Sequence, residues 1–148
     1  MQVKPFGGNY LVRLERGESA VESLREFANR YRVGFAEIRA IGTLDSVTLG
    51  YYDAKAKTYH HETLDEPLEV LNLTGNIARG EDGERIVHSH VTLGRPDYTT
   101  VGGHLVEGVV GPTLEVVVET APLTIRRRHD PNTGLEIWDL TALETFSV

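Results

Sequence analysis

The chain has 148 residues, of which 40% are hydrophobic and 25% are charged, as is typical of one soluble globular domain spanning residues 1–148. It contains no cysteine, which excludes disulfide bonds and thiolate metal ligands. Its formal net charge of −7 disfavours a free-standing nucleic-acid binder, because contacts to phosphates need a basic surface. There is no apolar run of membrane-spanning length and no apolar stretch typical of a signal peptide, so we expect a cytoplasmic protein.

The N-terminal part predicts one strand followed by one helix. Residues 9–16 alternate between apolar and polar side chains, as a half-buried strand does. Ser19 and Glu22 have the spacing of a capping box, which predicts a helix that runs to about Val33 and is ended by Gly34. The helix carries an apolar stripe at helical spacing, formed by Val21, Leu24, Phe27, Ala28 and Tyr31.

The rest of the chain favours β-structure. Alternation and turn residues predict strands at 35–41, 46–52, 68–78, 86–93, 105–110, 113–120, 123–127 and 135–138. In the run that starts at Leu68, we expect Leu71, Leu73 and Ile77 to share one face. One early helix and many strands predict an α+β domain, in which the helix packs on a mostly antiparallel β-sheet.

Three histidines carry the main functional signal. His88 and His90 alternate with Val87 and Val91, so a strand would direct both imidazoles to one side, away from the core. His104 follows a pair of glycines, on what could be the next strand. Three neutral imidazoles without a fourth protein ligand suit an open site for Zn²⁺ or another divalent transition metal. The alternative is a set of ordinary solvated histidines on an outer sheet face.

His60 and His61 are a second histidine pair. Because they are adjacent, a strand would direct them to opposite faces, and we do not expect them to act together.

The order of motifs resembles a known family. The motifs are Ala40–Leu44, Leu68–Ile77, His88–His90, Gly102–Leu105 and Pro112–Val116. Together they are similar to the plants and prokaryotes conserved (PPC) domain over roughly residues 9–138, as found in single-domain prokaryotic members.

That resemblance implies an antiparallel α+β domain assembled as a homotrimer, with His88, His90 and His104 associated with a bound metal, usually zinc. Plant members join the domain to AT-hooks that bind AT-rich DNA. This chain has no such hook, so DNA binding does not transfer with the fold. The resemblance therefore favours a trimeric metal-binding protein with a binding or regulatory role.

The alternative is a zinc-dependent hydratase or hydrolase, in which the open three-histidine site activates water. Such an enzyme needs a general base or a carboxylate that supports the ligands. Glu69, Glu107 and Glu115 are candidates, and Asp97 and Tyr98 lie in the loop between the histidine motifs.

Direct DNA binding is a third possibility. The only basic cluster is Arg126, Arg127 and Arg128, which a trimer would present three times. A solvated edge strand explains the same triplet, because charged side chains discourage edge-to-edge pairing.

Overall fold

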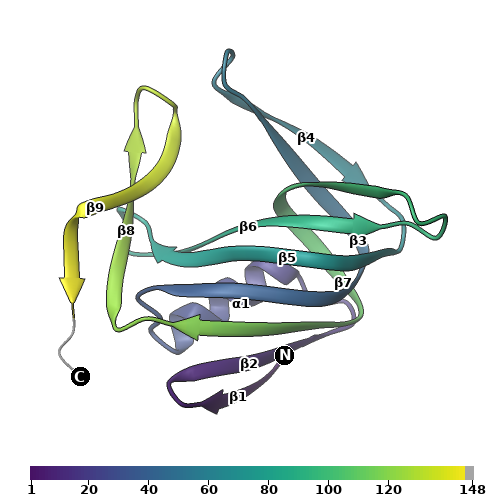
Figure 1. Cartoon of the computed structure of the whole chain (residues 1–148), viewed down its shortest axis with the longest axis horizontal. Coiled ribbons are helices and arrows are strands. Elements are labelled where there is room, and N and C mark those ends of the chain that lie inside the picture. The colour runs from purple at the N-terminus through teal and green to yellow at the C-terminus, as the bar shows by residue number, and fades with distance from the viewer. Residues whose placement is uncertain (146–148) are drawn as a thin grey trace.

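A computed structural model describes the backbone of residues 1–145 and the side chains of residues 1–141 (Figure 1). In this part of the chain the elements are β1 (Gln2–Phe6), β2 (Asn9–Glu15), α1 (Ala20–Arg30), β3 (Ala36–Asp53), β4 (Thr58–Leu64), β5 (Leu68–Arg79), β6 (Arg85–Gly94), β7 (Thr100–Thr120), β8 (Leu123–Asp130) and β9 (Leu135–Thr145). Within residues 1–145, no helix is long and apolar enough to cross a membrane.

The strands form one mostly antiparallel sheet in the order β1-β2-β7-β3-β5-β8-β9, with β4 added to β3. Strand β6 pairs with both β5 and β7, while β7 and β5 each pair with β3, so the hydrogen-bonded path closes on itself. Among the described strands, the parallel contact is the short one between β5 and β8, at Arg79 and Arg126. The prediction of a mostly antiparallel sheet with a single helix is confirmed for this part of the chain.

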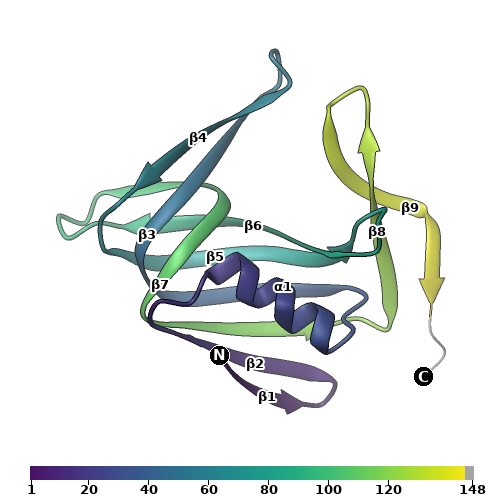
Figure 2. The ribbon, with the colours of Figure 1, turned by 180° about the vertical axis from the view of Figure 1, so that it is seen from behind.

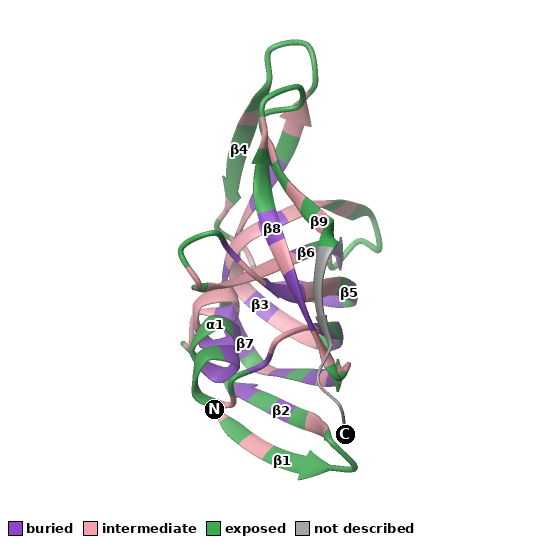
Figure 3. Ribbon diagram, turned by 90° about the vertical axis from the view of Figure 1, so that its left-hand side faces the viewer, coloured by how far each residue is buried: buried purple, intermediate pink, exposed green. Residues whose placement is uncertain are grey.

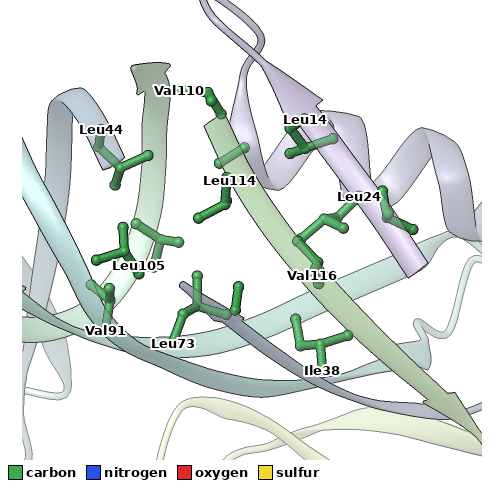
Figure 4. Close-up of a cluster of buried hydrophobic side chains, with 14 of the residues drawn as sticks. Leu14, Leu24, Ile38, Leu44, Leu73, Val91, Leu105, Val110, Leu114 and Val116 are labelled. Atoms are coloured by element: carbon green, nitrogen blue, oxygen red, sulfur yellow. The ribbon is translucent and has the colours of Figure 1, made fainter. Parts of the chain in front are cut away.

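Helix α1 lies against one face of the sheet (Figure 2). Leu24, Phe27 and Ala28 on the predicted stripe are buried in the same cluster as Leu114 and Val116 of β7. Figure 3 shows the alternation of buried and exposed residues along the strands, and Figure 4 shows the aliphatic side chains that meet between the elements. The histidine motifs therefore belong to strands that a continuous apolar core holds in place.

The predicted capping box at the start of α1 is wrong. Ser19 occupies the N-cap position, but its side chain makes no capping bond within the helix. The Ser19 hydroxyl instead donates to Glu107 Oε2 at 2.5 Å, and Glu22 pairs with Arg25 at 2.8 Å. The carboxylate of Glu107, on β7, accepts hydrogen bonds from the free N–H groups of the helix start in place of the Ser19 side chain.

The predicted end of α1 is also too late. The helix ends at Arg30, and Arg32 adopts a left-handed conformation with φ of 53°. Gly34 is required for a different reason, since a Cβ there would lie 2.6 Å from Thr124 Oγ1 and 2.7 Å from the Leu123 carbonyl oxygen. It permits close packing against the start of β8.

Strands β3 and β7 are each continuous where the sequence predicts a break. Register shifts near Gly42 and between Thr48 and Leu49 let β3 bend without ending. Gly42, with φ of 150°, has no room for a side chain, because a Cβ would lie 2.3 Å from the Thr113 carbonyl oxygen. The turn-like residues at these points mark bends inside long strands.

A bulge in β5 overturns one predicted face. The register shifts between Val70 and Asn72, so Leu73 and Ile77 point into the core while Leu71 is 51% exposed. Periodicity alone places Leu71 with Leu73, because a one-residue bulge leaves no mark on the alternation before it.

Candidate metal centre

Strand register brings the three histidines together. His90 of β6 lies directly opposite His104 of β7, and His88 is two residues from His90 on the same strand face. The three ring centroids are 5.1 to 5.5 Å apart. One ligand nitrogen from each ring lies within 4.8 Å of the others, a spacing at which the three rings could hold a metal ion. Strands β6 and β7 thus bring together the three histidines that the sequence pattern singled out.

Buried side chains and glycines next to the histidines fix the positions of the three rings. Ser89 and Val91 alternate with the histidines and are buried, so His88 and His90 point away from the core as predicted. Glycines let the neighbouring strands approach closely beside them. A Cβ at Gly75 would lie 2.2 Å from the His88 carbonyl oxygen, and one at Gly102 would lie 2.5 Å from the Val91 carbonyl oxygen.

The local electrostatics favour the neutral imidazoles of His88 and His104. Partial burial, with the nearby charges of Arg127 and the other two histidines, lowers the pKa of His88 to about 4. Burial, with the charges of His90, His61 and Arg127, also lowers the pKa of His104. Neutral imidazole is the form that coordinates a metal, so these rings need no deprotonation at neutral pH.

The donor set fits a transition metal. Nδ1 of His104 is buried and has no hydrogen-bond partner within the described residues, which is unusual for a polar atom that no ligand engages. The three donors are all imidazole nitrogens, which suit Zn²⁺ and its neighbours better than Mg²⁺ or Ca²⁺.

Arg127 is the site residue that the sequence analysis missed. Its side chain is buried, with 5% relative exposure, and its guanidinium donates to His88 Nδ1 at 3.0 Å, Asn76 Oδ1 at 2.9 Å and the Glu136 carbonyl oxygen at 2.6 Å. Burial lowers the pKa of this guanidinium. The prediction that the three arginines form one basic patch or solvated edge is therefore wrong for Arg127. Strand alternation was the available signal, since the middle arginine must face away from its two neighbours.

The carboxylates predicted as partners of the metal are used elsewhere. Glu107 caps α1, accepting hydrogen bonds from the backbone N–H groups of Val21 at 2.9 Å and Glu22 at 3.3 Å. Glu115 lies opposite Arg13 in the register of β2 and β7, and it is eleven residues beyond His104 along β7.

The other three candidates lie at the far end of the β6–β7 hairpin. The register pairs Glu69 with Gly94, and Asp97 and Tyr98 occupy the turn that follows. Four residue steps separate Gly94 from His90, roughly 13 Å along a strand. The structure does not bring these residues to the histidines.

His60 and His61 lie on β4, outside the three-histidine cluster. His60 is exposed and lies 3.8 Å from Asp53, whereas His61 is close enough to His104 for its charge to act on that ring. The two therefore sit in different surroundings, as expected of adjacent strand residues.

Comparison with known proteins yields one family and several close structures. The model of the Plants and Prokaryotes Conserved (PCC) domain matches residues 1–122. A search of curated proteins finds no match. The metal-containing protein AF0104 from Archaeoglobus fulgidus is 36% identical, with 93% of this chain and 99% of that chain covered and a TM-score of 0.82.

Two further structures are similar over nearly the whole chain. A putative DNA-binding protein from Bacteroides thetaiotaomicron is 32% identical, covering 95% of this chain and 98% of that chain at a TM-score of 0.91. A plant- and prokaryote-conserved protein from Pyrococcus horikoshii is 31% identical, covering 93% of each chain at a TM-score of 0.82.

Proposed function

The chain belongs to the Plants and Prokaryotes Conserved domain family, and from that premise we propose that it is a cytoplasmic metal-binding protein with a binding or regulatory role. His88, His90 and His104 are its ligands, and Zn²⁺ is the favoured metal. The observation that carries the proposal is the convergence of three imidazole nitrogens within 4.8 Å on a sheet face turned away from the core. The similar Archaeoglobus protein is itself named as containing a metal.

Metal analysis of the purified protein tests this proposal. We expect about one zinc ion per chain by mass spectrometry, and a higher unfolding temperature when zinc is added to chelator-treated protein. His90→Gln should abolish both effects with little cost in stability, because His90 is exposed. His60→Gln is the matched control, since His60 is exposed and outside the cluster. A wild-type protein that neither retains zinc nor gains stability from it would refute the proposal.

We propose a binding role and not turnover because of where the carboxylates lie. Hydration or hydrolysis at the metal would need a general base close to the three histidines. Glu107 caps α1, and Glu115 lies on another part of the sheet. Glu69, Asp97 and Tyr98 lie at or beside the distant turn between β6 and β7. Within the described residues, the charged side chain that donates a hydrogen bond to the cluster is Arg127, which contacts His88 and does not accept protons at neutral pH.

Assembly as a homotrimer is part of the proposal. The sheet carries exposed apolar side chains next to a groove of about 570 Å³, including Leu11 at 48% and Ile41 at 61% exposure, with Val117 between them. Apolar surface of this kind is protected by association. Light scattering should give the mass of three chains for the wild type, and Ile41→Asp should shift it towards one. Tyr98→Ser, an exposed position in a turn, should leave it unchanged, and a monomeric wild type would refute the trimer.

DNA binding is not what we propose for this chain, although the Bacteroides protein carries that description. A net charge of −7 and the burial of Arg127 leave little basic surface for phosphates. We expect no retention on duplex DNA at moderate salt. Salt-sensitive retention that an Arg126→Ala, Arg128→Ala double variant loses would overturn this expectation.

A further inference from the structure

A cleft of about 540 Å³ opens beside the three histidines. Its floor is the outer sheet face, with Asn76 of β5, His88 of β6 and His104 of β7, and its walls are Tyr59 of β4 and the β8–β9 hairpin. The β3–β4 and β8–β9 hairpins project to the same end of the molecule (Figure 3).

The tips of the two hairpins touch above the cleft. Lys57 Nζ donates to the Pro131 carbonyl oxygen at 3.3 Å, and the Tyr52 hydroxyl donates to the Thr133 carbonyl oxygen. The cleft is therefore framed by contacts between elements that are far apart in the sequence.

The cleft combines one buried cation with apolar walls. The apolar side chains come mainly from β6 and β9 and comprise Ile86, Val87, Leu135, Ile137 and Trp138. The guanidinium carbon of Arg127 lies 6.0 Å from the Trp138 ring. The carboxylate of Glu136, the acidic residue of this lining, lies 3.4 Å from His129, and its charge acts on Arg127 only from beyond ion-pair distance. Within the described residues, no carboxylate lies within ion-pair distance of Arg127.

A buried guanidinium without an anion is costly. Arg127 uses three of its five N–H donors, all on uncharged acceptors, and its Nε is buried with no partner among the described residues. Three neutral hydrogen bonds do not neutralise the charge. Because the described residues provide no anion in contact with Arg127, the site suits a negatively charged ligand.

Metal coordination would increase that demand. Arg127 only donates, so His88 Nδ1 uses its lone pair to accept the hydrogen bond. If His88 ligates through Nδ1, that lone pair is no longer available to Arg127. If it ligates through Nε2, Nδ1 must carry the ring proton and cannot accept. In either case Arg127 loses this acceptor, and one more N–H becomes free beside a newly bound positive charge.

We infer that the cleft binds a small organic carboxylate with a short apolar portion, which places its carboxylate at Arg127 beside the histidine cluster and its apolar part against Ile137 and Trp138. This inference rests on the proposed metal site. A carboxylate matches one planar guanidinium, and the apolar walls suit a hydrocarbon chain. Inorganic phosphate has no apolar portion for the Ile137 and Trp138 side of the cleft, so this lining favours a carboxylate that carries one.

Trp138 is the only tryptophan in the chain and lines the cleft, so its fluorescence reports binding. Zinc-loaded protein should show a saturable fluorescence change with 3-methylbutanoate, and calorimetry should give the same dissociation constant. The isosteric neutral amide, 3-methylbutanamide, should bind at least about tenfold more weakly, because it brings no charge. Chelator-treated protein should also bind 3-methylbutanoate more weakly than the zinc-loaded form.

Arg127→Met should weaken 3-methylbutanoate binding about 30-fold or more, the loss typical when one member of a buried charge pair is removed. Arg128→Met is the matched control on the same strand, where the side chain is 52% exposed, and should bind as the wild type does. Because the amide comparison uses wild-type protein, it decides the question even if Arg127→Met fails to fold.

The outcomes separate the two proposals. If the wild type takes up no zinc, the proposed metal site fails. If zinc loads but 3-methylbutanoate gives no saturable signal, or binds no better than its amide, the carboxylate inference is wrong and the metal site stands. Tighter binding of inorganic phosphate than of 3-methylbutanoate would overturn the choice of carboxylate.

Discussion

Replacing Glu107 distinguishes a structural carboxylate from one that serves the metal. Its two oxygens accept hydrogen bonds from the Ser19 hydroxyl at 2.5 Å and from the backbone N–H groups of Val21, Glu22 and Gly108 at 2.9, 3.3 and 2.7 Å. Three of these donors belong to the start of α1. Glu107 is therefore the cap of a helix whose own sequence supplies none.

The magnitude follows from these contacts. Loss of an N-cap acceptor costs about 0.5–2 kcal/mol, and loss of a negative charge at a helix N-terminus adds about 0.3–1 kcal/mol. We therefore expect Glu107→Ala to lower the free energy of unfolding by about 1–3 kcal/mol. Glu107→Gln keeps one accepting oxygen and should lose about 1 kcal/mol, most of it from the missing charge.

Urea denaturation followed by circular dichroism measures these losses, and zinc content is measured on the same samples. Glu115→Ala is the control, an exposed glutamate on the same strand, and should change stability by less than about 0.5 kcal/mol. All three variants should keep the zinc content of the wild type. A Glu107→Ala protein with unchanged stability and reduced zinc content would refute the capping role and return this carboxylate to the metal site.

Three further predictions test the histidine site and the strand β5 that lies beside it. Without metal, the free energy of unfolding should fall by about 1–2 kcal/mol as pH falls from about 6.5 to 4, after allowance for solvent screening. The reason is that His88 has a pKa of about 4 in the folded protein, so the unfolded chain takes up this proton at a higher pH than the folded state does. Urea titrations should show a weaker pH dependence for His88→Gln, and equal slopes would contradict the assignment. Gly75→Ala places a methyl group 2.2 Å from the His88 carbonyl oxygen, so thermal unfolding should show a loss of about 1–3 kcal/mol and titration should show weaker zinc binding. Leu73→Ala should cost about 2–5 kcal/mol and Leu71→Ala less than half as much, and equal losses in denaturation would contradict the bulge between them.

The sequence by itself determined the kind of fold and the position of the histidines. Alternation in the run around His88 and His90 separates the histidine-bearing side of the strand from the core, because a strand repeats every two residues. Helical spacing likewise identifies the buried face of α1. These signals are local, so they can be read before any tertiary contact is known.

Only the tertiary structure decided which distant groups meet. Glu107 reaches α1 across more than eighty residues, and a bulge turns Leu71 out of the core without disturbing the preceding alternation. Arg127 reaches His88 because β8 lies beside β5, a contact between strands that no short motif records. Hydrogen bonding and burial act on distances in space, so the sequence could propose the three histidines, whereas only the fold could place a buried arginine and an apolar cleft beside them.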